Sequence, residues 1–333
     1  MALTVKEEKS KKDYIRTWKE GMRHLHWFEE STLFNYNRDE MIQEILGDFG
    51  ETESVFFMAK FARNEKVIGV LGIKIREDVG VLRRWEPAIP LNDRCSGAGE
   101  ALVERGFRWL QQKKVQKAVC MLRYQYGSPE TADWHINLYR KCGFKQRGPV
   151  YVQLLADLSC VPIEKPAHIA DFTITTSESY TLKDFSEFVL KAYSSITEDR
   201  AIHGWDMFVS IPDEILKGLR SIKKGKHGLS PFELWKIAEV QGEPAGFIIS
   251  FMPDDRYRPP YGVIGLIGVF PEFRRRGIAH TLISEMHKCF RAHGCHYAYV
   301  GTPKTNEKAI NLYKKAEYTP IFELINFESQ LQN

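Results

Sequence analysis

The stretch Arg274-Arg275-Arg276-Gly277-Ile278-Ala279 lies between an apolar run, residues 263–270, and a helical pattern that continues through Leu282 and Ile283. We therefore expect a strand, a basic turn and a helix N-terminus in that order. Backbone N–H groups at a helix start lack partners and point outward, so they bind phosphate groups well. Gly277 lets the backbone approach a phosphate closely, and the arginines add charge-assisted contacts. The stretch predicts a site for a phosphate-bearing ligand.

Two blocks of the sequence recur in the same order. The basic turn has a counterpart 180 residues upstream (274 − 94), Arg94-Cys95-Ser96-Gly97-Ala98-Gly99. Residues 310–318, INLYKKAEY, match residues 136–144, INLYRKCGF, at an offset of 174 (313 − 139). An internal duplication explains two matched blocks with nearly equal offsets. The 333 residues are also enough for two domains of about 150 residues each.

The periodicity of apolar residues predicts a similar order of elements in each half. The first half is expected to contain helices at 14–30 and 38–46 (Asn37 as N-cap), strands at 54–62, 66–76 and 79–89, a helix at 99–113, a strand at 117–124, a helix at 132–141 and a strand at 150–155. The second half is expected to contain a strand at 172–176, a helix at 182–193, an irregular region to 229, strands at 233–240, 244–252 and 261–269, a helix at 278–293, a strand at 297–301, a helix at 306–315 and a strand at 321–327. Residues 159–171, which hold Pro162 and Pro166, are the expected linker between domains 1–158 and 172–333.

Composition excludes several classes of protein. Apolar content of 43% and charged content of 27% are ordinary for a soluble globular protein. The net charge of +4 gives no sign of nucleic-acid binding, and no apolar stretch approaches the roughly 20 residues that span a bilayer. Residues 1–13 lack the apolar core of a signal peptide. We expect a cytoplasmic protein that binds neither nucleic acid nor membrane, and we leave its oligomeric state open.

The six cysteines are scattered and form no Cys-x-x-Cys pair. This spacing argues against a zinc knuckle, a thioredoxin-type site and a disulfide framework. Reduced, mostly buried thiols and no metal site are therefore expected.

With a second signature downstream, the basic turn resembles the GNAT superfamily of acyl-coenzyme A-dependent N-acyltransferases. The family's pyrophosphate signature, Gln/Arg-x-x-Gly-x-Gly/Ala, is met by Arg274, Gly277 and Ala279. Its next signature, Asn-x-x-Ala-x-x-Leu-Tyr, is met by Asn306, Ala309, Leu312 and Tyr313, and the Gly-Phe that often ends it is here Glu317-Tyr318. The resemblance covers nearly the whole chain as two copies, as in mycothiol synthase and similar double-domain members. It implies an α/β (three-layer α+β) fold of two tandem domains, each a mixed, mostly antiparallel sheet flanked by helices.

The resemblance implies acetyl-coenzyme A as co-substrate. Its pantetheine arm would pair with backbone groups of Ile267 and Val269 at splayed strand edges, while residues 274–279 hold the pyrophosphate. A backbone N–H on this strand would also steady the oxyanion. Tyr313 would protonate the departing thiolate, and Asn306 would contact the coenzyme or hold the helix start.

The general base is less defined, because residues 261–269 contain neither a carboxylate nor a histidine. Asp254, at the end of the preceding strand, is the chosen candidate for taking a proton from the ammonium group. A water chain is an alternative. Other candidate side chains are Asp255, Glu233, Glu239, Glu272 and His203.

The first copy keeps only part of these signatures. It retains Arg94, Gly97, Gly99 and Tyr139 as candidate coenzyme-site residues. It has Ala132 where the family has the helix-start Asn, and His135 in place of the family Ala. Glu86 is a possible acid on its strand. We expect reduced or absent catalysis in this copy; a second active site, a coenzyme site without turnover and a purely structural half all remain open.

The expected reaction is transfer of an acetyl group from acetyl-coenzyme A to a primary amine of a small molecule by direct attack. A protein or peptide N-acetyltransferase is one alternative, and a non-catalytic acyl-coenzyme A sensor is another. The segments in which such folds build the acceptor pocket hold Trp205, Phe208, Tyr257, Tyr261, Arg256 and Arg258. A P-loop protein is not expected, because no Gly-Lys-Ser/Thr follows either turn.

Overall fold

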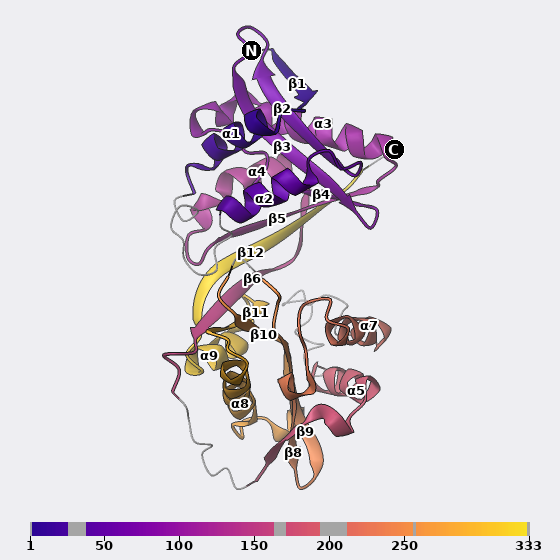
Figure 1. The fold of residues 1–333 in the computed structure, drawn as a ribbon, viewed down its shortest axis with the longest axis vertical. Helices are drawn as coiled ribbons and strands as arrows, with labels where there is room; N and C mark the ends of the chain where they lie inside the picture. Colours follow the sequence, from indigo (N-terminus) through magenta and orange to yellow (C-terminus); the bar gives the residue numbers. More distant parts are fainter. Residues whose placement is uncertain (1, 26–37, 163–170, 194–211, 256–257, 332–333) are drawn as a thin grey trace. The chain divides into compact units, whose positions relative to one another are not determined.

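The computed structural model describes residues 2–25, 38–162, 171–193, 212–255 and 258–331 (Figure 1). The chain divides into two compact units. The first unit comprises Met1–Arg147 and Glu323–Asn333, and the second comprises Gly148–Phe322.

The first unit is a sheet with helices packed against it. Its elements are β1 (Leu3–Glu7), α1 (Lys11–Met22), α2 (Arg38–Asp48), β2 (Ser54–Phe61), β3 (Val67–Arg76), β4 (Val79–Leu82), α3 (Ala98–Gln112), β5 (Lys117–Gln125) and α4 (Asp133–Lys141), with most of β12 (Thr319–Gln330). The strands follow the order β1-β2-β3-β4-β5-β12. Pairs β1–β2, β2–β3 and β3–β4 are antiparallel, and β4–β5 is parallel. Helices α1 and α3 both contact β3.

The second unit repeats this arrangement. Its elements are most of β6 (Lys145–Asp157), then β7 (Thr173–Thr176), α5 (Leu182–Tyr193), α7 (Pro212–Lys223), β8 (Trp235–Val240), β9 (Glu243–Phe251), β10 (Tyr261–Val269), α8 (Ile278–Ala292), β11 (Tyr297–Pro303) and α9 (Glu307–Lys315). The strands follow the order β6-β11-β10-β9-β8-β7, in which only β10–β11 is parallel. Helix α8 covers one face of this sheet, and α5 and α7 cover the other (Figure 1). The predicted mixed, mostly antiparallel sheet flanked by helices is confirmed.

Each half of the sequence places its last strand in the other unit. Residues 151–157 of β6 pair antiparallel with β11. From Glu323 onward, β12 belongs to the first unit, where the Tyr124 hydroxyl donates to the Glu323 carboxylate at 3.0 Å. The units therefore differ from the predicted domains 1–158 and 172–333 at both final strands.

Several predicted elements need correction. Strand β1 was missed, and the helix expected from residue 14 to 30 ends at Met22. The strand expected at 79–89 ends at Leu82, because the chain turns at Trp85, whose φ of 62° lies in the left-handed region. Helix α7 was missed in the region expected to be irregular. Its buried residues Ile215, Leu219 and Ile222 follow the spacing of one helix face. The predicted cap Asn37 and linker residues 163–170 lie outside the described residues.

All six cysteines are free. Only Cys120 and Cys295 are buried, so the expectation of mostly buried thiols is wrong. Among the described residues, none of the helices has the length and apolarity that crossing a bilayer requires.

Candidate active site

Strands β10 and β11 separate in the middle of the second unit. They pair only from Tyr261–Ile264 to Tyr297–Val300. The pairing of β10 with β9 shifts register around Gly265, and β10 then continues beside β9 to Val269. Strand β11 stays beside β6 to Pro303. A gap therefore opens between two strands of one sheet, where the family resemblance implies splayed strand edges.

A cavity of about 890 Å³ occupies this gap, and all of its lining residues belong to the second unit. It brings together most of the residues that the sequence selects: Ile267, Val269, Arg274, Arg275, Gly277, Ile278, Ala279, Asn306 and Tyr313. Arg276 and Asp254 lie outside the lining. The lining also contains residues that sequence reasoning missed: Tyr151, Tyr193, His280, Glu307 and Lys308. Tyr151 comes from β6 and has no signature to reveal it, because its strand belongs to the other half of the sequence.

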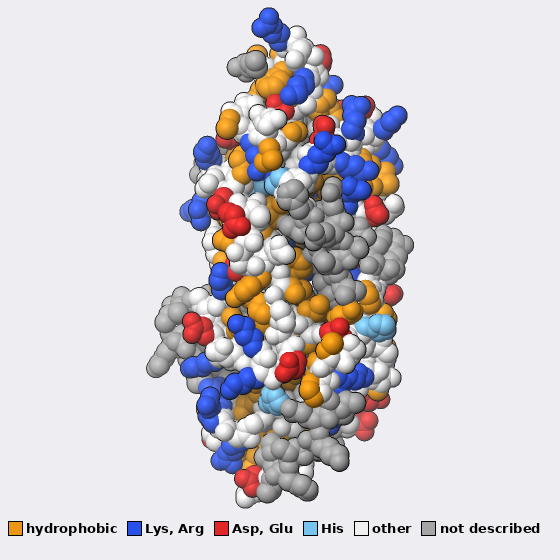
Figure 2. All heavy atoms as spheres, turned by 90° about the vertical axis from the view of Figure 1, so that its left-hand side faces the viewer, with side chains coloured by type: hydrophobic (Ala, Val, Ile, Leu, Met, Phe, Trp, Pro, Cys, Tyr) orange, Lys and Arg blue, Asp and Glu red, His pale blue; other side chains and the backbone are white. Residues whose placement is uncertain are grey.

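The turn before α8 has a backbone conformation suited to an anion. Gly277 is the N-cap of α8 and has a φ of 82°, a left-handed value that favours glycine. A glycine N-cap offers no side chain to the first N–H groups of the helix, which therefore remain available to a ligand. Basic side chains gather on the lower part of the face in Figure 2, the side on which Figure 1 draws α8 and α9.

The arginines of the turn have different surroundings. The Arg274 side chain donates from Nε to the Val269 carbonyl at 3.1 Å and from Nη2 to the Ala192 carbonyl at 2.8 Å. The Arg276 guanidinium lies 5.5 Å from the centroid of the Phe273 ring. Arg274 therefore contacts the backbone of its own unit, in addition to lining the cavity.

Helix α9 brings Asn306 and Tyr313 to the cavity. The Asn306 side chain accepts a hydrogen bond from the Ala309 N–H at 3.2 Å, so it caps the helix, the second of its two predicted roles. The Tyr313 side chain is 4% exposed. Burial raises the pKa of its phenol well above the usual value, and nearby Tyr193 raises it further. Tyr313 is therefore protonated at neutral pH, as a general acid must be.

The described side chains that the sequence offered as general bases do not line this cavity, and several of them form ion pairs or hydrogen bonds elsewhere. Asp254 is exposed. Asp255 pairs with Arg258, and Glu272 pairs with Lys191 at 2.7 Å. Glu239 accepts from the Tyr180 hydroxyl at 2.7 Å. Within the described residues, Glu307 is the carboxylate in the cavity lining. His203, Trp205, Phe208, Arg256 and Tyr257 lie outside the described residues.

The first unit has the same turn, but its surroundings differ. Gly97, the N-cap of α3, has a φ of 79°, close to that of Gly277. The Arg94 guanidinium donates to His24 Nε2 at 2.7 Å and lies 4.7 Å from the Trp134 ring centroid. Burial lowers the pKa of Arg94 to about 10. The side chain of Arg94 is thus held by aromatic neighbours.

In the first unit, the counterparts of two cavity-lining residues are buried and contact other parts of the protein. His135, the counterpart of Ala309, is buried, and its Nε2 lies 2.9 Å from the Trp85 carbonyl. The Trp85 ring is also buried and contacts His135 edge-on at 5.3 Å. Tyr139, the counterpart of Tyr313, is fully buried and donates to the Glu86 carbonyl at 2.6 Å. The Tyr139 hydroxyl, which corresponds to the proposed proton donor Tyr313, therefore already donates its hydrogen bond within the protein.

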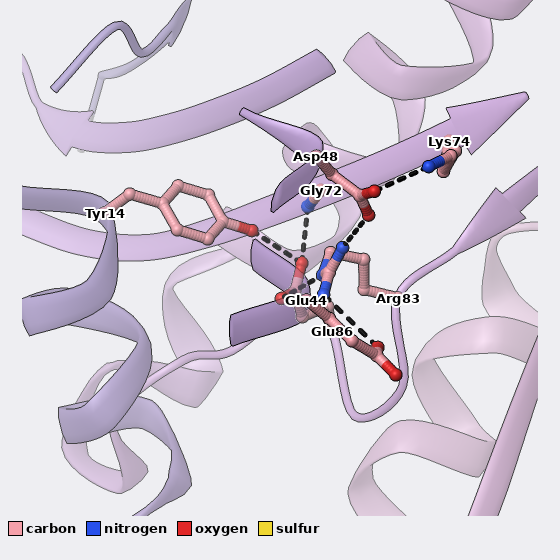
Figure 3. Close-up of polar contacts among 7 residues, drawn as sticks. All are labelled: Tyr14, Glu44, Asp48, Gly72, Lys74, Arg83 and Glu86. Carbon is pink, nitrogen blue, oxygen red and sulfur yellow. Dashed lines mark hydrogen bonds and ion pairs between the residues drawn. The ribbon is translucent and has the colours of Figure 1, made fainter. Parts of the chain in front are cut away.

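The Glu86 side chain lies at the centre of a buried polar cluster (Figure 3). Its Oε2 accepts from the Tyr14 hydroxyl at 2.7 Å and from the Gly72 N–H. Arg83 lies 3.9 Å from the other carboxylate oxygen and also pairs with Asp48, which pairs with Lys74. Burial raises the pKa of Glu86 from 4.5 to about 7, although Arg83 and these hydrogen bonds lower it. Glu86 is therefore part of the core and does not reach a ligand.

The raised pKa of Glu86 predicts a pH-dependent stability. Since its folded pKa lies above the unfolded value, its favourable contribution is complete below pH about 4.5 and is lost as pH rises through about 7. The loss amounts to about 3 kcal/mol, at 1.36 kcal/mol for each pKa unit. In Glu86→Gln this component should be absent. Urea unfolding of both proteins at pH 5 and pH 8 measures it; an equal pH dependence in the two proteins would contradict the assignment.

The sequence matches known acetyltransferases in its second half. Residues 206–318 match the model of the Acetyltransferase (GNAT) family. An acetyltransferase of Pectobacterium atrosepticum is 35% identical over 89 residues, and one of Sodalis glossinidius is 36% identical over 86 residues. These matches cover 27% and 26% of this chain, and 60% and 57% of the two relatives. The chain thus spans somewhat more than half the length of these relatives.

Two solved structures resemble the whole chain. A GCN5-related N-acetyltransferase from Sphaerobacter thermophilus aligns with a TM-score of 0.59 at 15% identity, covering 99% of this chain and 96% of that one. A tandem GNAT protein from the clavulanic acid biosynthesis pathway aligns with a TM-score of 0.52 at 13% identity, covering 100% and 99%. At such identities the likeness concerns the fold alone. Residues 206–318 of this chain therefore match the acetyltransferase (GNAT) family, and the chain as a whole has the fold of tandem GNAT proteins.

Proposed function

We propose that this protein is an N-acetyltransferase that moves an acetyl group from acetyl-coenzyme A to a primary amine of a small molecule, with one coenzyme site, in the second unit. The observation that carries this proposal is the cavity itself. It joins a splayed strand, a glycine-capped helix start and the buried phenol of Tyr313 in one space. These are the parts that hold a pantetheine arm, a pyrophosphate and a leaving thiolate.

Each part has a chemical role in the proposed reaction. The N–H groups at the start of α8 bind the pyrophosphate, and Arg275, His280 and Lys308 add positive charge around it. The amine nitrogen attacks the thioester carbonyl carbon, a C–N bond forms, and the C–S bond breaks. An N–H group of β10 stabilises the oxyanion in between. Tyr313 donates its proton to the departing thiolate, and a base or a water chain takes a proton from the amine.

Burial affects the phenol and the thiol alike. A free phenol has a pKa of about 10 and a free thiol about 8.5, so proton transfer between them in water is unfavourable. Burial raises the pKa of Tyr313, but the same apolar cleft destabilises a thiolate as well. The proton transfer therefore depends on a short donor distance in the complex.

A search for the acceptor tests the proposal. Purified protein is mixed with acetyl-coenzyme A and a panel of small primary amines, or with lysine-containing and free-N-terminus peptides, and free thiol is measured. We expect thiol release with at least one small amine and mass-spectrometric detection of its N-acetyl product. Release only with peptides would favour the protein acetyltransferase. Binding of acetyl-coenzyme A without release in any mixture would favour the sensor.

A further inference from the structure

The backbone of β10 has a defined orientation beside the cavity. The Phe270 N–H donates to the Ala245 carbonyl at 2.9 Å, next to β9. The Gly268 carbonyl also faces β9, because it would lie 2.9 Å from a Cβ atom placed on Gly246. Backbone groups alternate sides along a strand. The N–H and C=O groups of Ile267 and Val269 therefore point away from β9, into the gap left by β11.

Both of these cavity-facing carbonyls already have a donor. The Tyr193 hydroxyl donates to the Ile267 carbonyl at 2.9 Å, and Arg274 Nε donates to the Val269 carbonyl at 3.1 Å. The donors come from two elements, the end of α5 and the turn before α8. The N–H groups of Ile267 and Val269 face the same gap, where no strand pairs with them in the described part of the chain.

Three contacts fix the end of α5 to this region. The Arg274 Nη2 atom donates to the Ala192 carbonyl at 2.8 Å, and Lys191 pairs with Glu272 at 2.7 Å. The Ala192 methyl group packs so closely that a Cβ atom on Gly268 would lie 2.7 Å from it. The Tyr193 hydroxyl is therefore placed on Ile267 by a rigid arrangement of its neighbours.

We infer that Tyr193 and Arg274 are positioning residues that make the cavity-facing edge of β10 a donor edge, which offers N–H groups to the ligand and withholds C=O groups. This inference rests on the proposed function and deepens it. Paired as in a strand ladder, the pantetheine arm would need both donors and acceptors from β10. A donor edge instead binds carbonyl oxygens of the ligand, and its two N–H groups can bind two of the three that the arm offers, which are those of its two amides and that of the thioester.

The same arrangement affects the transition state. In a cleft with little water, a bare carbonyl beside the thioester would repel the negative charge that develops on its oxygen. The Tyr193 hydroxyl reduces this repulsion because its proton lies on the Ile267 carbonyl. Arg274 has the corresponding effect at Val269, nearer the pyrophosphate. Arg274 is the first residue of the pyrophosphate signature, a position that accepts Gln or Arg. On this account the position requires a hydrogen-bond donor rather than a positive charge.

The variant Tyr193→Phe tests the first of these roles. We expect kcat to fall about 10- to 100-fold, less than the roughly 100- to 1,000-fold lost with a direct oxyanion donor, because Tyr193 acts through the Ile267 carbonyl. The KM for acetyl-coenzyme A should change less than about threefold. Tyr180→Phe is the matched control, because it also removes one tyrosine hydroxyl that donates a hydrogen bond, in this case to Glu239 outside the cavity lining. It should retain wild-type kcat. An unchanged kcat in Tyr193→Phe, or a loss explained by KM, would overturn the role of Tyr193.

The pair Arg274→Gln and Arg274→Met tests the second role. Gln keeps a donor and loses the charge, whereas Met loses both at similar length. We expect the Gln variant to bind acetyl-coenzyme A within about threefold of wild type. The Met variant should bind about tenfold more weakly, because the Val269 carbonyl in the cavity loses its donor. The dependence of Kd on salt should stay as in wild type, because no phosphate charge pair is removed. Equal losses in both variants, with a weaker salt dependence, would make Arg274 a phosphate ligand.

The readouts separate this inference from the proposed function. If wild type neither binds acetyl-coenzyme A nor releases thiol with any amine, the proposed function fails. If wild type is active and the Tyr193 and Arg274 variants behave as their controls, only the donor edge fails. Circular dichroism and thermal midpoints identify a variant that does not fold, and the other position then decides the inference.

Discussion

Replacing Gly277 by Glu should reduce the affinity for acetyl-coenzyme A by at least about 100-fold, so that calorimetry detects no binding at micromolar protein. A carboxylate at the start of α8 would repel the pyrophosphate and occupy the place where its oxygens approach the N–H groups. The left-handed φ of 82° adds backbone strain of about 1–2 kcal/mol for any residue with a Cβ atom. The free energy of coenzyme binding lost with the anion site should be larger than this strain energy.

Gly97→Glu provides the control for that measurement. Gly97 caps α3 with nearly the same backbone conformation, and a Cβ atom on it would meet no heavy atom within 4 Å. It carries the same backbone strain and the same added charge, in the first unit. Acetyl-coenzyme A binding should equal that of wild type. If Gly277→Glu binds as well as Gly97→Glu does, the coenzyme does not bind at this turn.

Tyr313→Phe should lower kcat for thiol release by about 100-fold or more, the usual effect of removing a general acid, with little change in acetyl-coenzyme A affinity. The ring and its packing against Tyr318, with centroids 5.7 Å apart, remain in the variant. Only the proton donor to the thiolate is lost. Steady-state kinetics with the best amine from the panel, together with calorimetry, measure the two quantities separately.

Tyr139→Phe is the matched substitution in the first unit. Tyr139 donates its hydroxyl to the Glu86 carbonyl, so the variant should lose about 1 kcal/mol of stability, as is typical of one hydrogen bond. Its kcat should stay at the wild-type value. Wild-type turnover in Tyr313→Phe would exclude Tyr313 as the acid, whereas a loss of turnover in Tyr139→Phe would mean that the first unit also takes part.

Local signatures predicted the second unit well. The run from Tyr261 to Val269 forms β10 as expected, and the glycine turn caps α8. Asn306 caps α9, and Tyr313 reaches the same cavity. These features depend on short-range spacing and on backbone conformation, which the sequence specifies directly.

The exchange of final strands could not be predicted in this way. Both β6 and β12 are amphipathic strands that follow similar helices, and either could pair with β11 as far as the pattern of apolar residues allows. The choice between them depends on contacts far apart in the sequence, such as that between Tyr124 and Glu323. For the same reason, Tyr151 carried no signal of its place in the cavity lining.

The differences between the first unit and the second could be predicted from the sequence only in part. Loss of the signature Asn and the presence of His135 indicated a degenerate copy. The sequence did not indicate that Trp85 would turn inward or that Glu86 would join a core cluster. Tyr193 was also missed, because a tyrosine that ends an amphipathic helix has the pattern of an ordinary core residue.

The number of acetyl-coenzyme A molecules bound by each wild-type chain tests the central claim most directly. Calorimetric titration or native mass spectrometry can count them. We predict one molecule for each chain, because the second unit has an open cavity, whereas in the first unit His135, the counterpart of Ala309, is buried and the Tyr139 hydroxyl is bonded to the Glu86 carbonyl. A count of two would show that the first unit binds coenzyme as well, and a count of zero would contradict the proposed function itself.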